Sequence, residues 1–174
     1  MKIRRISVRE YKNVSVDVVL HAELITLLVG QNGMGKSNLI EILLLVFDEL
    51  NQLYKGRKPA EEEKLTFDYS LEYECRGRIF RVRKEDDKHF FWELTVGGDG
   101  QDIVQACDIK HIILPSQIVG YYSGENKRVR TLVAKHIKRE ESSKRRRYSK
   151  GSVERLIPKK LFFAENRHSM AVLT

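Results

Sequence analysis

The order of apolar and polar residues predicts a group of strands, then one helix, then a second group of strands. Three short apolar runs occupy residues 1–29, and we interpret "KIRRISVREY", "VSVDVVL" and "ELITLLVG" as strands. The third run is continuously apolar over residues 24–29, which is typical of a strand buried on both faces of a mixed or parallel sheet. The chain is therefore expected to begin with strands whose last member lies in the interior.

The apolar residues recur with a helical period from Ser37 onward, and the glycine and proline of "YKGRKP" are expected to end this helix. Its predicted apolar face consists of Leu39, Ile40, Leu43, Phe47, Leu50 and Tyr54. Glu41, Asp48 and Glu49 lie off that face. The pattern thus predicts an amphipathic helix on which Asp48 and Glu49 are solvated.

Strict alternation follows the helix in "KLTFDYSLEYE", which is the pattern of a half-buried antiparallel strand. The side chains predicted to share its buried face are Leu65, Phe67, Tyr69, Leu71 and Tyr73. The runs "RIFRVRK" and "HFFWELTV" continue the alternation across the turns "CRG" and "EDDK", and "GGDG" ends it. These three runs predict a β-meander.

Weaker patterns occupy the rest of the chain. "HIILPSQIVGYYSGENKR" indicates a further strand running into a loop, helical spacing returns over residues 129–137, and "KKLFFAE" indicates a strand. We expect a P-loop ATPase N-terminal lobe over residues 1–126, a basic helix and mobile loop over 127–160, and the start of a further strand over 161–174. This organisation is expected of one lobe of a longer ATPase.

Composition narrows the class of protein. The 174 residues suffice for one ordinary domain. No apolar run has the length of a signal peptide core or a membrane span, so a cytoplasmic protein without a membrane partner is expected. Cys75 and Cys107 have no metal-ligand spacing and are expected to be reduced thiols.

The motif with the clearest chemistry is "GQNGMGKS", which matches G-x-x-x-x-G-K-[ST] between an apolar run and an amphipathic helix. In such a loop, Gly30, Gly33 and Gly35 let backbone N–H groups surround phosphates. Lys36 places its ammonium on the β- and γ-phosphate oxygens, and Ser37 offers a hydroxyl to Mg²⁺. The fold class predicted from this context is α/β, a P-loop NTPase that binds ATP and Mg²⁺.

"LLLVFDE" imitates the strand that ends in a hydrolytic Asp-Glu pair, but it lies within the predicted helix. Asp48 follows Ser37 by 11 residues, which is about 16 Å along a helix at 1.5 Å per residue. A carboxylate so far from the loop cannot reach Mg²⁺ there. The stretch therefore predicts half of a hydrolytic site, and the chain alone is expected to bind ATP without efficient hydrolysis.

Three stretches resemble the ABC-type ATPases of the SMC and RecF kind, in families of the AAA-15 or AAA-23 sort. "KIRRISVREYKNV" is similar to the family's first strand, and "ITLLVGQNGMGKSNLIEIL" to its phosphate loop and helix. "IILPSQIVGYYSGENKRVR" resembles the segment that carries its Q-loop, and "YYSGEN" also resembles ATPases associated with restriction systems. The resemblance implies an ABC-ATPase head lobe, with a mixed sheet around the phosphate-loop helix plus an antiparallel β-meander.

The resemblance also implies functional residues and a partner. Gln117 would contact Mg²⁺ and the attacking water, so it joins Lys36 as a catalytic candidate and Ser37 as a metal candidate. The nucleotide-binding residues implied are Lys12, Asn13, Gly30, Asn32, Gly33, Met34, Gly35, Lys36, Ser37 and Asn38. A plain loop glutamine at Gln117 and a β-turn at Lys12 are the alternatives. In the full-length protein, two heads would form a head-to-head homodimer through ATP.

Residues 127–160 hold 14 Lys and Arg against 3 Glu, a local charge of +11 in a chain whose net charge is +8. Such a segment could follow the phosphate backbone of DNA, or it could be a solvated loop around a helix. We therefore expect an ATPase of DNA repair, chromosome maintenance or phage defence. The alternatives are a nucleic-acid-binding module with a vestigial nucleotide site and, less favoured, a P-loop kinase or GTPase.

Overall fold

The structure is a computed structural model of the 174-residue chain. It describes residues 1–12, 14–20, 35–59, 61–97, 101–121, 131, 134, 138 and 161–164. The chain forms two compact units, Met1–Leu114 and Pro115–Thr174, and each is described by itself. The candidate nucleotide-binding residues before residue 115 all belong to the first unit.

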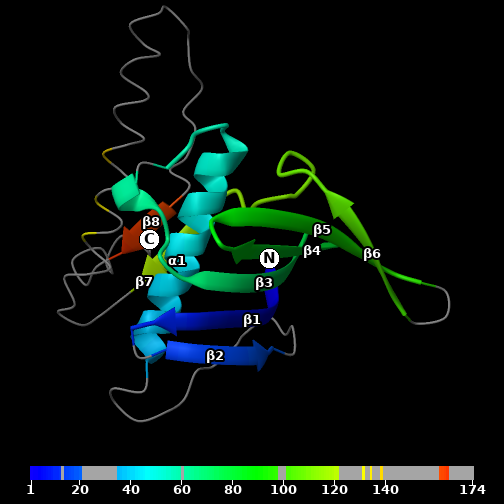
Figure 1. Ribbon diagram of the computed structural model, residues 1–174, viewed down its shortest axis with the longest axis horizontal. Coiled ribbons are helices and arrows are strands. Elements are labelled where there is room, and N and C mark those ends of the chain that lie inside the picture. The colour runs from blue at the N-terminus through cyan, green and yellow to red at the C-terminus, as the bar shows by residue number, and fades with distance from the viewer. Residues whose placement is uncertain are drawn as a thin grey trace, which may run out of the picture. The chain divides into compact units, whose positions relative to one another are not determined.

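One six-stranded sheet organises the first unit (Figure 1). Its strands are β1 (Lys2–Tyr11), β2 (Val14–Val19), β3 (Asp68–Cys75), β4 (Arg78–Glu85), β5 (Lys88–Val96) and β6 (Asp102–Cys107). The order across the sheet is β2-β1-β3-β4-β5-β6, and each neighbouring pair is antiparallel. The predicted meander over β3, β4 and β5 is confirmed.

The mixed sheet expected around the phosphate-loop helix is not seen among these six strands, which include β1 and β2. β1 pairs with β3, placing Ile6 opposite Leu71 and Val8 opposite Tyr69, so β1 and β2 extend the antiparallel meander. Alternation alone could not show this, because it marks a strand's buried face without naming the neighbouring strand. The third predicted strand, residues 24–29, lies outside the described residues.

The helix α1 (Lys36–Tyr54) packs on one face of this sheet (Figure 1), and a short 3₁₀ helix, Glu61–Glu63, follows it. The ring of Phe47 on α1 meets that of Tyr73 on β3, with 5.7 Å between their centroids. At the end of α1, Gly56 adopts φ +70°. Its N–H donates a hydrogen bond to Leu53 O, and the N–H of Arg57 donates one to Gln52 O. This pair of bonds is a Schellman motif, so the predicted stop at Gly56 is confirmed.

The predicted buried face of "KLTFDYSLEYE" is also confirmed, since its five members are at most 6% exposed, although β3 itself begins only after Leu65 and Phe67. The core of the described residues comprises Ile6, Val8, Ile42, Leu44, Val46, Phe47, Leu50, Leu65, Phe67, Tyr69, Leu71, Tyr73, Cys75, Phe80, Val82, Leu94 and Ile112. Strands β1, β3, β4 and β5 and the helix α1 contribute to this core, whereas β2 and β6 contribute no fully buried side chain. The packing therefore holds α1 against the inner strands of the sheet.

The prediction that Asp48 and Glu49 are solvated is wrong. Asp48 is 6% exposed and Glu49 is 3% exposed, whereas Ile40, assigned to the apolar face, is 40% exposed. Glu49 Oε2 accepts a hydrogen bond of 3.1 Å from the Tyr69 hydroxyl and lies 3.0 Å from His89 Nε2. Because buried charges are tolerated where partners satisfy them, these two partners from the sheet explain how a carboxylate of α1 can occupy the core.

In the second unit, β7 (Ile118–Tyr121) pairs in parallel with β8 (Leu161–Ala164), which confirms the strand predicted in "KKLFFAE". Thr131, Ala134 and Lys138 are helical, as the spacing over residues 129–137 predicts. The expected strand in "HIILPSQIVGYY" is β7 alone, since residues 111–114 form a turn and an irregular segment. The sequence analysis missed β6, whose residues "DIVQAC" show little alternation.

No helix in the described ranges has both the length and the apolar composition required to cross a bilayer.

Tyr69→Phe tests the buried carboxylate of α1. Burial and the nearby Glu49 charge raise the pKa of Tyr69 well above its usual value of 10.0, so its hydroxyl keeps the proton that Glu49 accepts. Because hydrogen bonds to charged groups are the stronger ones, we expect this substitution to lower the free energy of unfolding by about 2 kcal/mol in a urea titration.

Tyr73→Phe is the matched control, because the Tyr73 hydroxyl donates to the neutral carbonyl of Ile113. Its expected cost is about 1 kcal/mol. Equal losses from the two variants would contradict the view that Glu49 is a buried, hydrogen-bonded charge.

Candidate functional site

The start of α1 is built around Gly35, the residue that precedes its first turn. Gly35 has φ +86° and ψ 6°, in the left-handed region that only glycine enters without a steric penalty. A Cβ at this position would lie 2.8 Å from Val14 Cγ2, closer than side chains pack. Two constraints, one on the backbone and one on space, therefore require glycine where the predicted phosphate loop meets the helix.

The first turn of α1 carries Lys36, Ser37 and Asn38, and it contains no acidic residue. The first intrahelical bond runs from Leu39 N–H to Gly35 O at 2.9 Å. Amide groups of this first turn sit at the positive end of the helix dipole, where an anion is stabilised. An ammonium, a hydroxyl and helix-terminal amides, with no competing carboxylate in the turn, fit a phosphate group and its Mg²⁺.

The turn between β1 and β2 lies beside this helix start. The register of the β1–β2 pair shifts between Val8 and Tyr11, and Glu10 and Lys12 both have positive φ, of 59° and 54°. The Tyr11 ring packs on Phe67 with 4.7 Å between centroids, and Lys12 Nζ lies 4.8 Å from the centre of the Tyr11 ring. The turn thus has the left-handed backbone usual in a two-residue hairpin loop, and its aromatic residue packs against the core residue Phe67.

Lys12 also reaches α1. Its Nζ lies 2.7 Å from Glu41 Oε2, and the Glu41 side chain is 10% exposed against 35% for Lys12. Burial lowers the pKa of Lys12, but hydrogen bonding to Glu41 and Tyr11 outweighs that effect, so the pKa is raised above 10.5. Lys12 is therefore a cation at neutral pH, held by a largely buried carboxylate.

The predicted residues Lys12, Gly35, Lys36, Ser37 and Asn38 all belong to the first unit, and Lys12 meets α1 through Glu41. Asn13, Gly30, Asn32, Gly33 and Met34 lie outside the described residues. Gln117 belongs to the second unit, where it is exposed and directly precedes β7. Its role at the metal stays a prediction.

The pairing of Glu41 with Lys12 was not expected from the sequence. The helical pattern showed only that Glu41 lies off the apolar face. Lys12 precedes it by 29 residues, so no local pattern could connect the two. Asp48 and Glu49 do lie within α1, as predicted, and not at the end of a strand. They are therefore separated from the helix start along the same helix.

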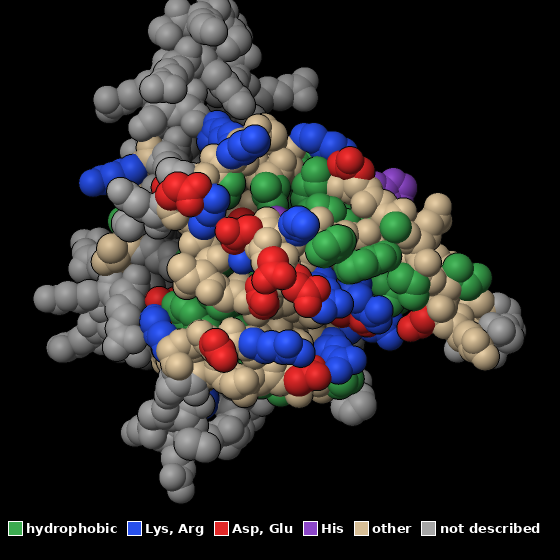
Figure 2. Space-filling model, viewed as in Figure 1, with side chains coloured by type: hydrophobic (Ala, Val, Ile, Leu, Met, Phe, Trp, Pro, Cys, Tyr) green, Lys and Arg blue, Asp and Glu red, His purple; other side chains and the backbone are tan. Residues whose placement is uncertain are grey.

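The face of the sheet in Figure 2 shows a different chemistry. Charged side chains of both signs lie over β1 to β4, and hydrophobic side chains gather over β5 and β6, where Phe90 is 41% and Val104 is 46% exposed. Arg81 pairs with Glu72 at 3.0 Å. Cations and carboxylates alternate on this face, so it presents mixed charge and not a strip of positive charge.

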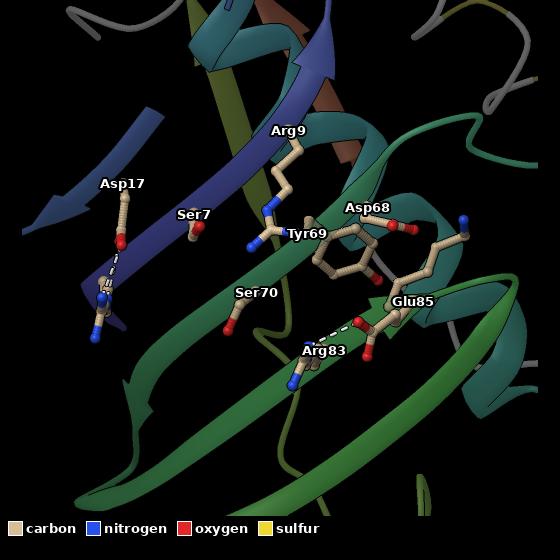
Figure 3. Close-up of a pocket in the computed structure, with 10 residues that line it drawn as sticks. Ser7, Arg9, Asp17, Asp68, Tyr69, Ser70, Arg83 and Glu85 are labelled. Atoms are coloured by element: carbon tan, nitrogen blue, oxygen red, sulfur yellow. Dashed lines mark hydrogen bonds and ion pairs between the residues drawn. The ribbon is translucent and has the colours of Figure 1, made fainter. Parts of the chain in front are cut away.

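A hollow of about 180 Å³ over β1, β3 and β4 shows the same balance (Figure 3). Arg5 makes a two-pronged contact with Asp17, at 2.9 and 2.8 Å, and Arg83 binds Glu85 at 2.8 Å. Both guanidinium groups are thus already satisfied by neighbouring carboxylates. This hollow is a network of surface ion pairs, and the start of α1 is the stronger candidate site.

Residues 1–153 match the AAA_15 family, described as an AAA ATPase domain. The chain belongs to this family of AAA ATPase domains. The resemblance to AAA-15 ATPases is thereby confirmed, and the AAA ATPase domain has nucleotide binding and ATPase activity as its class of function. No curated protein and no solved structure gave a match to this AAA ATPase domain.

Gly35→Ala tests the geometry of the site. The left-handed backbone costs alanine about 1–2 kcal/mol, and the contact with Val14 Cγ2 adds an overpacking cost of about 1–3 kcal/mol. We therefore expect a loss of about 2–5 kcal/mol in the free energy of unfolding, measured by urea denaturation.

Gly56→Ala is the matched control, because Gly56 also has positive φ but nothing lies within 4 Å of its added Cβ. Gly56→Ala should lower the free energy of unfolding only by the cost of the left-handed backbone. Val14→Ala combined with Gly35→Ala removes the clashing methyl group, so the double variant should lose less than the sum of the single variants. Equal losses at Gly35 and Gly56 would contradict a close approach by Val14.

Proposed function

We propose that this AAA ATPase domain binds ATP with Mg²⁺ at the start of α1. The observation that carries the proposal is the arrangement at Gly35, where a left-handed glycine closed against β2 leads into a helix whose first turn holds Lys36 and Ser37. This arrangement follows a sequence match to a phosphate loop. Backbone and side-chain chemistry thus support the same ligand.

Each residue then has a distinct task. The helix start and the loop amides bind phosphate oxygens, and Lys36 adds a positive charge at the β- and γ-phosphates. Ser37 offers its hydroxyl to Mg²⁺, which when bound would neutralise charge on the phosphates as the terminal bond breaks. These residues bind and orient the nucleotide, and none of them supplies a base for water.

The proposed fold is a P-loop NTPase of the ABC-ATPase head type, related to SMC and RecF ATPases. Asp48, at about 16 Å along α1 from Ser37 at 1.5 Å per residue, lies too far away to activate water. We propose that this chain alone binds ATP without efficient hydrolysis, and that Gln117 and a second head complete the reaction. ATP would then join two heads, and hydrolysis would separate them.

The biological setting that we propose is DNA repair, chromosome maintenance or phage defence, including a restriction-associated role. Support comes from the local charge of +11 over residues 127–160 and from the exposed, helical positions Thr131, Ala134 and Lys138 within it. The mixed charge of the sheet face makes residues 127–160 the better candidate for DNA contact. The alternative is a nucleic-acid-binding module whose nucleotide site is vestigial.

Lys36→Ala tests the nucleotide site. Losing a charged donor to phosphate removes about 1.5–3 kcal/mol, so we expect the dissociation constant for MgATP to rise at least about tenfold in titration calorimetry. Lys55→Ala is the matched control, because Lys55 lies at the opposite end of the same helix. It should leave MgATP affinity unchanged.

Circular dichroism should first establish that each variant is folded. If folded wild-type protein binds no MgATP but retains salt-dependent DNA binding, the result would overturn the proposed ATP site and favour the vestigial-site alternative. If the Lys36 and Lys55 variants lose equal affinity for MgATP, the loss would come from the change in net charge and not from a contact in the phosphate loop.

A further inference from the structure

We propose that Glu41 is a positioning residue of the nucleotide site, which holds the Lys12 ammonium beside the first turn of α1. This inference rests on the proposed function and deepens it, because it makes the β1–β2 turn part of the nucleotide site. It concerns a carboxylate, Glu41, that the phosphate-loop motif does not include.

Glu41 lies close to Ser37 on the helix. It follows Ser37 by four residues on α1, and residues so spaced lie on one face, with Cβ atoms about 5–6 Å apart. Ser37 is the residue assigned to Mg²⁺. The Lys12–Glu41 pair is therefore one helical turn from the proposed metal and on the same side of the helix.

The β1–β2 turn and the first residue of β2 touch α1 at two points. Val14 approaches Gly35 so closely that a Cβ there would be 2.8 Å from its methyl carbon. Lys12 meets Glu41 at 2.7 Å. Because positions 35 and 41 lie on either side of Lys36 and Ser37, the turn spans the part of the helix that would bind phosphate.

Glu41 and Lys12 also balance each other's charge. The Glu41 side chain is 10% exposed, and a carboxylate so far removed from water requires a partner. Lys12 supplies it, and Glu41 in turn offsets the repulsion that Lys12 and Lys36 would exert if both were near one another without a ligand. The pair can thus keep a second cation close to the helix start while the site holds no nucleotide.

The backbone conformation of the turn at Lys12 is also part of this arrangement. Lys12 has φ +54°, a conformation that non-glycine residues adopt only where surrounding contacts compensate. Its ammonium lies 4.8 Å from the Tyr11 ring centre as well as against Glu41. Left-handed backbone is usual in a two-residue hairpin loop such as the one between the paired residues Tyr11 and Val14, and from this loop Lys12 meets Glu41 on α1.

The test measures MgATP affinity and stability together in the full chain. Glu41→Gln and Lys12→Met should each raise the dissociation constant for MgATP about tenfold in titration calorimetry. The double variant should lose little more affinity for MgATP than either single variant, because the two residues act as one unit. Glu49→Gln is the matched control, since Glu49 is also a buried, hydrogen-bonded carboxylate of α1 but serves the core.

A charge reversal separates positioning from a purely structural role. Lys12→Glu combined with Glu41→Lys retains an ion pair between the turn and the helix, so urea denaturation should show stability recovering relative to either single reversal. The affinity for MgATP should stay low, because the group on the turn is now an anion. Recovery of affinity in parallel with stability would overturn the positioning role.

The remaining outcomes distinguish this inference from the proposed function. Wild-type protein that binds MgATP, together with a Glu41→Gln variant of unchanged affinity, overturns the inference and leaves the nucleotide site intact. Loss of affinity in Glu49→Gln equal to that in Glu41→Gln also overturns it, because any buried carboxylate would then have the same effect. Folded wild-type protein that binds no MgATP overturns both.

Discussion

The close approach of Val14 to Gly35 is the constraint on which the candidate site depends. The contact leaves no space for a Cβ, and the backbone of Gly35 is left-handed, so the same residue satisfies a steric and a conformational requirement. It joins the first residue of β2 to the first turn of α1. Because β2 is the edge strand of the sheet beside β1, the contact fixes the helix start relative to the whole sheet.

The carboxylates of α1 show how the sheet and the helix depend on one another. Glu41 is paired by Lys12 from the β1–β2 turn, and Glu49 by Tyr69 and His89 from β3 and β5. Each partner comes from the sheet or its β1–β2 turn, so these two carboxylates find their partners only in the folded state. Buried polar groups of this kind favour one arrangement of helix on sheet, since a shifted helix would leave them unpaired.

Family membership and geometry support the same class of function from independent directions. The match to AAA ATPase domains covers residues 1–153 and assigns the class of activity. The helix start supplies the local chemistry, an ammonium and a hydroxyl at the positive end of a helix dipole. The family match does not assign any residue, and the geometry does not by itself assign a nucleotide, so the proposed site needs both.

The sequence by itself determined the features that depend on neighbouring residues. Alternation in "KLTFDYSLEYE" predicted the buried face of β3, the glycine of "YKGRKP" predicted the end of α1, and "GKS" placed its cation and hydroxyl in the first helical turn. Backbone geometry and side-chain period act over a few residues, and such patterns can therefore be found without a fold.

The tertiary structure alone decided which strands are neighbours and which polar residues are buried. Alternation could not show that β1 lies beside β3, and the helical period did not reveal that Asp48 and Glu49 are buried. The pairing of Lys12 with Glu41 depends in the same way on residues 29 positions apart. Burial of a charge is favourable only when its partner arrives from another element, and that meeting is a property of the whole fold.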